Sequence, residues 1–194
     1  VPNFSNVMLH KRNILESFGD LYSEFWQKSV VSLEIKEMTR IRNARITDCG
    51  YWKNVRFESA RVAGLSEEKI QEVKDGYEEV LDEKITAALL LTDQIIGASR
   101  PLEKKNTVLI KRNLTREERA EISLGVGLFM GMSKVLIALG LEPEDMETTL
   151  VKTPGSDRKN LWSRDARPIS NLILFERKAI KYQATWQPAW FQGL

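Results

Sequence analysis

The sequence predicts an all-α fold, with about six to eight helices in one helical domain. Apolar residues recur at helical spacing in several segments, such as Ile14, Phe18 and Leu21 near the start of the chain. Motifs that cap the beginning of a helix precede other segments, and glycines that can end a helix follow them. The chain has 194 residues and 42% hydrophobic content, enough for one domain with a buried core.

The first part of the chain is expected to form two long helices. A short helical turn within 5–12 leads into the first, which begins near Asn13 and buries an aromatic-rich stripe. The stripe consists of Ile14, Phe18, Leu21, Tyr22 and Phe25. Ser32 is the expected N-cap of the next helix, which carries Glu37.

Two further helices are expected in the middle of the chain. Ser66 is placed to cap the first of them, which should end near Gly76. The second should run from about 82 to 96, with a polar connector at 104–106.

The longest helix is predicted between Thr115 and about Leu139. Thr115 and Glu118 have the spacing of a capping box, and Gly140 is the expected left-handed residue at the end. Three glycines inside this helix each cost roughly 1 kcal/mol relative to alanine, which indicates close approach of another backbone, within the subunit or across an oligomer. They are Gly125, Gly127 and Gly131.

The character of the chain changes after a last short helix, expected at 142–150. Residues 152–194 hold eight Lys or Arg against three Asp or Glu, together with three of the five tryptophans. Basic residues among aromatics can bind single-stranded nucleic acid. The charges are scattered and no RNA-binding motif is present. We therefore expect a helical domain at 1–151 and a basic, aromatic C-terminal arm at 152–194 that packs on the body or a neighbouring subunit.

The segment 34–65 carries the candidate site. It is predicted to form two helices joined by a tight corner at 46–48, with Asp48 as N-cap and Gly64 as the stop of the second helix. The corner places Cys49, the only cysteine, at a helix N-terminus. Unsatisfied N–H groups and the helix dipole favour a thiolate there.

The spacing within the second helix predicts one shared face for Cys49, Trp52 and Arg56. If the two helices pack antiparallel, a thiol, a guanidinium and the carboxylate of Glu37 could converge on a small site. The alternative for Glu37 is an i,i+3 pair with Arg40 on a solvated helix face.

These residues resemble the carboxymuconolactone decarboxylase/alkylhydroperoxidase D-like (AhpD-like) family. The resemblance rests on Glu37, on Cys49 twelve residues later, on Tyr51 and Trp52, and on the run Ala-Gly-Leu-Ser-Glu-Glu at 63–68. It is closest over 34–72 and extends in helix order over about 4–150. In the peroxidase members, a second cysteine and a histidine stand where this chain has Trp52 and Arg56.

The resemblance implies a catalytic site made of Cys49, Glu37 and Arg56, with Trp52 and Tyr51 binding substrate. Without a second thiol, a peroxidase-related antioxidant reaction would need Cys49 oxidation followed by reduction by an external thiol. Alternatively, Glu37 would act as a base on a small anionic substrate held by Arg56, in decarboxylase-like or lyase-like chemistry. Family members assemble as trimers or hexamers, so a homo-oligomer is expected.

A competing hypothesis is a catalytically inactive oligomeric binding or scaffold protein. Trp52 would then fill the former site, Arg56 would form a structural ion pair with Glu37, and Cys49 would be an inert buried thiol.

The composition argues against several other classes of protein. A net charge of +2 implies no global attraction to nucleic acid, and apolar runs such as 87–91 are too short to span a bilayer. One cysteine provides neither a disulfide nor a metal cluster, and no cofactor motif is present. His10, the only histidine, is expected on the surface or in a structural role. A cytoplasmic protein without a membrane segment is expected.

Overall fold

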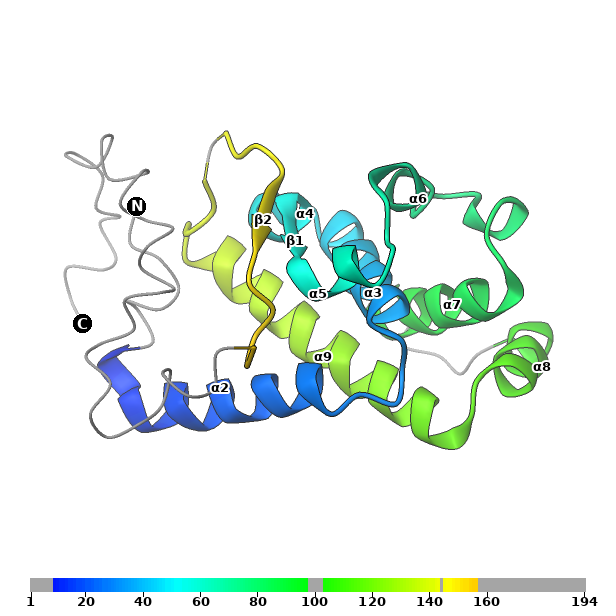
Figure 1. Cartoon of the computed structure of the whole chain (residues 1–194), viewed down its shortest axis with the longest axis horizontal. Helices are drawn as coiled ribbons and strands as arrows, with labels where there is room; N and C mark the ends of the chain where they lie inside the picture. The colour runs from blue at the N-terminus through cyan, green and yellow to red at the C-terminus, as the bar shows by residue number, and fades with distance from the viewer. Residues whose placement is uncertain (1–8, 98–102, 144, 157–194) are drawn as a thin grey trace.

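The computed structural model describes residues 9–97, 103–143 and 145–156, and within them it is mostly helical (Figure 1). The all-α prediction is confirmed, with eight α-helices in the described residues. The helices and 3₁₀ turns are η1 (Leu9–Lys11), α2 (Arg12–Gln27), α3 (Leu33–Ile46), α4 (Gly50–Asn54), α5 (Glu58–Val62), α6 (Glu67–Gln71), η2 (Tyr77–Glu79), α7 (Glu83–Gly97), α8 (Lys104–Asn113) and α9 (Arg116–Ala138). Two short strands, β1 (Val55–Phe57) and β2 (Thr149–Val151), pair in parallel.

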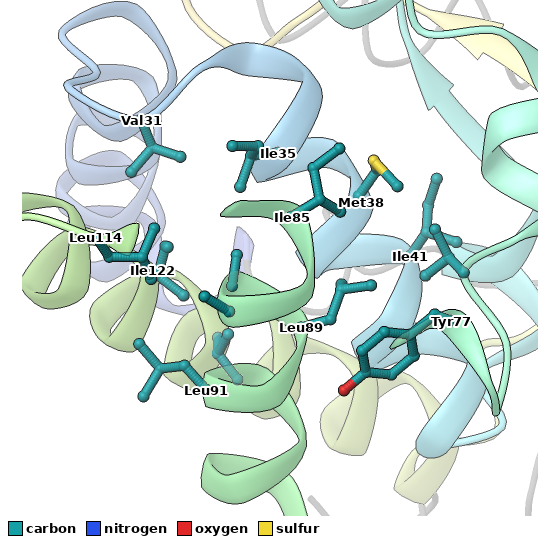
Figure 2. Close-up of a cluster of buried hydrophobic side chains, with 14 of the residues drawn as sticks. Val31, Ile35, Met38, Ile41, Tyr77, Ile85, Leu89, Leu91, Leu114 and Ile122 are labelled. Atoms are coloured by element: carbon teal, nitrogen blue, oxygen red, sulfur yellow. The ribbon is translucent and has the colours of Figure 1, made fainter. Parts of the chain in front are cut away.

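Three long helices form the centre of the fold. α3, α7 and α9 pack against one another, and α8 packs against α7 (Figure 1). Figure 2 shows the side chains between them, with Met38 and Ile41 of α3 facing Leu89 of α7. All three are fully buried, so they form the middle of the main hydrophobic core.

A second cluster, rich in aromatic rings, fixes α2 to α9. Tyr22, Phe25 and Trp26 pack edge to face around Phe129 of α9 and Phe57 of β1. The predicted buried stripe is thus right for its C-terminal part.

The same stripe is wrong for two residues. Ile14 is 50% exposed and Leu21 is 44% exposed. Leu21 precedes Tyr22, so it points about 100° away around the helix from the face that meets α9. Ile14 lies towards the N-terminal end of α2, outside the aromatic cluster.

The predicted helix caps are confirmed at Ser32, Ser66, Thr115, Gly64 and Gly140. Ser32 accepts a hydrogen bond from Ile35, and Ser66 accepts one from Lys69. Thr115 and Glu118 make the reciprocal bonds of the capping box. Gly64 and Gly140 have positive φ values of 101° and 62°, as expected for residues that end helices. His10 is exposed.

Some element boundaries differ from the predictions. Asp48 has a φ of 55° and follows α3, so Cys49 instead takes the N-cap position of α4. Residues 104–106 open α8, where Glu103 O accepts from Thr107 N. The helix predicted from Ser66 to near Gly76 ends at Gln71.

The segment expected as a last helix contains β2. Its Thr149 and Val151 pair with Val55 and Phe57 of β1. β-branched side chains suit an extended backbone, and the partner strand lies almost a hundred residues earlier in the chain. From residue 157 on, the predicted C-terminal arm lies outside the described residues.

Gly125 gives α9 its close contact with α2. A Cβ at Gly125 would lie 2.4 Å from Cζ of Phe25, so the glycine admits an aromatic ring. The predicted approach of a backbone is therefore wrong here, because a side chain fills the space. At Gly127 and Gly131 a Cβ would meet no atom of the described residues within 4 Å.

Among the described residues, α9 alone has the length and apolar composition of a membrane-spanning helix. The core helix of an ordinary domain passes the same test, and one side of α9 lies in the core with α3 and α7.

A buried charge network ties the connector between α2 and α3 to α9. Glu121 accepts hydrogen bonds from Ser29 Oγ at 2.6 Å and from the backbone N–H groups of Val30 and Val31 at 2.8 and 3.2 Å. It also pairs with Lys36, whose side chain is 2% exposed. Burial raises the pKa of Glu121, but Lys36 and these hydrogen bonds outweigh it, so the pKa is lowered overall.

Replacing the Glu121 carboxylate by an amide should lower the stability of the fold. It should also make that stability less dependent on pH in the acid range. Since the folded-state pKa of Glu121 is lowered, its contribution is present above the ordinary glutamate value and lost as the pH falls. We expect Glu121→Gln to cost about 2 kcal/mol near neutral pH. It should also lose less stability than the wild type between about pH 5 and about pH 3. Urea unfolding across this range measures both effects, and parallel pH profiles would contradict the assignment.

Candidate functional site

The corner between α3 and α4 seals the Cys49 side chain. Its backbone N–H donates to Ala44 O at 2.9 Å, which closes the end of α3, and its carbonyl accepts from Lys53. The thiol is 0% exposed and belongs to a small apolar cluster with Leu136 and Leu141. Solvent therefore has no access to the sulfur in this conformation.

The electrostatics of the corner oppose a thiolate. Burial raises the pKa of Cys49, and this effect exceeds the lowering by the N–H groups of Trp52 and Tyr51. Glu142 raises it further. The Glu142 carboxylate also accepts a 2.5 Å hydrogen bond from Gly50 N, so it occupies the α4 N-terminus where a thiolate was expected.

Glu37 is buried, and its partner is Arg40. Arg40 Nε and Nη2 donate to the two carboxylate oxygens at 2.8 and 2.7 Å, and both side chains are 1% exposed. The N–H of Phe57 donates to the same carboxylate at 3.0 Å. The i,i+3 pair considered for Glu37 does exist, but inside the protein and not on a solvated face.

Arg40 also forms hydrogen bonds with the backbone of α4 and β1. Its remaining donors reach the carbonyls of Trp52 at 2.9 Å and Val55 at 2.6 Å. Burial alone would lower the pKa of Arg40, but the charge and hydrogen bonds of Glu37 raise it above the ordinary arginine value. Arg40 is therefore a permanently charged link between α3 and β1.

Arg56 binds Glu67, not Glu37. The predicted helix stops at Asn54 and the chain is extended over Val55–Phe57, so helical spacing no longer relates Arg56 to Cys49. Its guanidinium binds Glu67 at 3.0 Å and the carbonyls of Lys53 and Val55 at 2.7 and 2.9 Å. The predicted Glu37–Arg56 ion pair is wrong.

The three predicted catalytic residues thus have separate partners. Glu37 binds Arg40, Arg56 binds Glu67, and Cys49 lies in an apolar cluster. The two arginines meet at one atom, because both donate to the carbonyl of Val55. The sequence showed Arg40 as a possible partner of Glu37, whereas no local pattern indicated Glu67 or Glu142.

Of the two aromatic residues predicted to bind substrate, Trp52 packs against the guanidinium of the ion pair. The ring centroid of Trp52 lies 5.4 Å from the guanidinium carbon of Arg40, and the ring centroid of Phe57 lies 5.0 Å from it. Tyr51 packs edge to face on Trp52 at 4.8 Å. The indole N–H of Trp52 is buried and has no hydrogen-bond partner among the described residues.

A surface groove of about 490 Å³ lies elsewhere, where α2 ends and α5, α7 and α9 begin. Its polar lining includes Ser29, Ser32, Ser59 and the Lys84–Glu118 ion pair. None of the predicted catalytic residues lines it. Within the described ranges, no group of three His, Cys, Asp or Glu could hold a metal ion.

The chain matches no model of a known protein family, and its comparison with curated protein sequences gives no match.

Proposed function

We propose that this protein is a divergent member of the carboxymuconolactone decarboxylase/AhpD-like family that acts as an oligomeric binding or scaffold protein. The family assignment rests on the spacing of Glu37 and Cys49 and on the Ala-Gly-Leu-Ser-Glu-Glu run at 63–68. The non-catalytic role rests on one observation above all: the Glu37 carboxylate is closed into a buried ion pair with Arg40.

This ion pair argues against acid–base chemistry at Glu37. A general base must come within hydrogen-bond reach of a substrate proton. Both Glu37 oxygens already accept from Arg40, and one also accepts from the Phe57 N–H. Trp52 and Phe57 pack against the same guanidinium, so the neighbouring space is filled by aromatic rings.

The surroundings of Cys49 argue against peroxide or thiol chemistry. The thiolate is the reactive form of cysteine, and reactive cysteines are partly exposed in electropositive surroundings. Cys49 is 0% exposed, and its pKa is raised by burial. Arg56, which was predicted to share a helix face with Cys49, is instead paired with Glu67.

Cys49 should be unreactive in the folded protein. We expect iodoacetamide to alkylate it slowly near neutral pH and to label it fully once guanidinium chloride unfolds the chain, because only unfolding exposes the sulfur. Mass spectrometry of timed samples measures the label. Peroxide consumption with dithiothreitol as reductant should be the same for the wild type and for Cys49→Ala. Rapid labelling of the folded protein, or consumption that is lost in Cys49→Ala, would overturn the non-catalytic proposal in favour of a one-cysteine peroxidase.

A further inference from the structure

α9 has an apolar face that no described residue covers. The helix buries Ile122, Val126 and Phe129 on one side. On the opposite side Leu124 is 52% exposed and Val135 is 38% exposed. A lone exposed leucine is ordinary, but Leu124 and Val135 lie on the same face of α9 as Gly127 and Gly131, which also face open space.

Six exposed residues lie along one face of α9 and define a seam on it. They are spaced alternately by three and four positions, the repeat that keeps residues on one side of a helix. They are Glu117, Ala120, Leu124, Gly127, Gly131 and Lys134. A Cβ added at either glycine would meet no atom of the described residues within 4 Å, so the middle of the seam is a hollow.

We propose that the α9 helices of two copies of this chain pack antiparallel along this seam, about a two-fold axis between positions 125 and 126. In that register the side chain of Leu124 enters the hollow at the partner's Gly127, and Ala120 faces the partner's Gly131. Glu117 faces the partner's Lys134, which places opposite charges together at both ends of the contact. A two-fold axis repeats each of these pairings, so the surface is complementary to itself.

The charges favour a second copy over the other occupants of an apolar face. In a parallel pair, Glu117 would face the partner's Glu117, so like charges would lie together. The glycines would face the partner's glycines, which would leave a gap between the two helices. Against a lipid bilayer, Glu117 and Lys134 would lie in the same stripe as Leu124 and enter hydrocarbon without a counter-charge. Of these three arrangements, the antiparallel pair of helices is the one that satisfies both the shape and the charge of the seam.

This inference rests on the proposed scaffold function and is tested by the mass of the assembly. Light scattering after gel filtration of the full chain should give about twice the 22.3 kDa mass of one chain. Gly131→Leu fills the hollow at an exposed helix position, so it should give a single-chain mass while the helical content is kept. Val108→Leu enlarges an exposed apolar residue of α8, 61% exposed, and should leave the wild-type mass unchanged.

A charge exchange tests the register. Glu117→Lys and Lys134→Glu each place like charges together and should each weaken self-association by about tenfold or more. The double exchange restores opposite charges and should recover most of the wild-type affinity, as sedimentation equilibrium would measure. If Glu117→Lys acted only by weakening the start of α9, adding Lys134→Glu would bring no recovery.

Three results would overturn the proposed interface. These are a single-chain mass for the wild type, a double mass that Gly131→Leu leaves unchanged, and flotation with phosphatidylglycerol vesicles that Leu124→Glu abolishes. None of them depends on the labelling of Cys49, so failure of this interface and failure of the non-catalytic proposal are separate outcomes.

Discussion

Glu37→Gln is expected to lower the free energy of unfolding by about 3–5 kcal/mol. The amide keeps the shape of the carboxylate but leaves the Arg40 charge buried at 1% exposure without a counter-charge. Breaking a buried ion pair from one side carries a cost of this size. Chemical denaturation monitored by tryptophan fluorescence measures the change.

A matched control is present on the surface. Glu16 pairs with Arg12 at i,i+4, and their side chains are 51% and 71% exposed. Glu16→Gln removes the same charge from the same type of pair, yet should change the stability by about 0.5 kcal/mol or less. The difference between the two variants isolates the effect of burial.

The double variant Glu37→Leu/Arg40→Met should recover part of the loss, since it removes both buried charges together. Recovery should be incomplete, because the carbonyl of Trp52 and the N–H of Phe57 also lose their partners. A Glu37→Gln variant as stable as the wild type, or more stable, would contradict the structural role. It would indicate a carboxylate kept for chemistry at the expense of stability.

Gly125→Ala is expected to destabilise the fold by about 1–3 kcal/mol. The new methyl group would lie 2.4 Å from the Phe25 ring. That ring is held by edge-to-face contacts with Trp26 and Phe129 at centroid distances of 5.8 and 5.7 Å. The ring therefore has little freedom to move away, and the contact between α2 and α9 must loosen.

Gly127→Ala on the same helix is the control, and it should raise the stability of the fold where Gly125→Ala lowers it. Its Cβ would meet nothing among the described residues, so replacing glycine should stabilise the helix by roughly 0.5–1 kcal/mol. Both variants are best compared in the Leu124→Glu background, which removes any contribution from self-association. If Gly125→Ala and Gly127→Ala changed the stability by the same amount, helix propensity alone would explain both effects, and the contact with Phe25 would play no part.

Local signals in the sequence were sufficient for most helix ends. Ser32, Ser66 and the Thr115–Glu118 capping box act within four residues of themselves, so their neighbours determine their conformation. Likewise, Gly64 and Gly140 adopt the left-handed conformation that glycine tolerates.

The arrangement around Cys49 depends on residues far along the chain. Val55–Phe57 is extended because it pairs with Thr149–Val151, and Glu142 takes the N-terminus of α4. Neither partner can be inferred from the spacing of Cys49, Trp52 and Arg56. A continuous helix was therefore predicted, and with it a convergence of side chains that the structure does not contain.

The backbone amide of Phe57 donates its hydrogen bond to a side chain, the carboxylate of Glu37. An amide proton exchanges with solvent only when its acceptor is withdrawn, and local opening sets how often that happens. Deuterium uptake at this single position therefore reports how often β1 separates from the acid on α3. The exchange rate of the Phe57 amide thus measures how often β1 moves away from Glu37, a motion that a small molecule would need in order to reach this buried carboxylate.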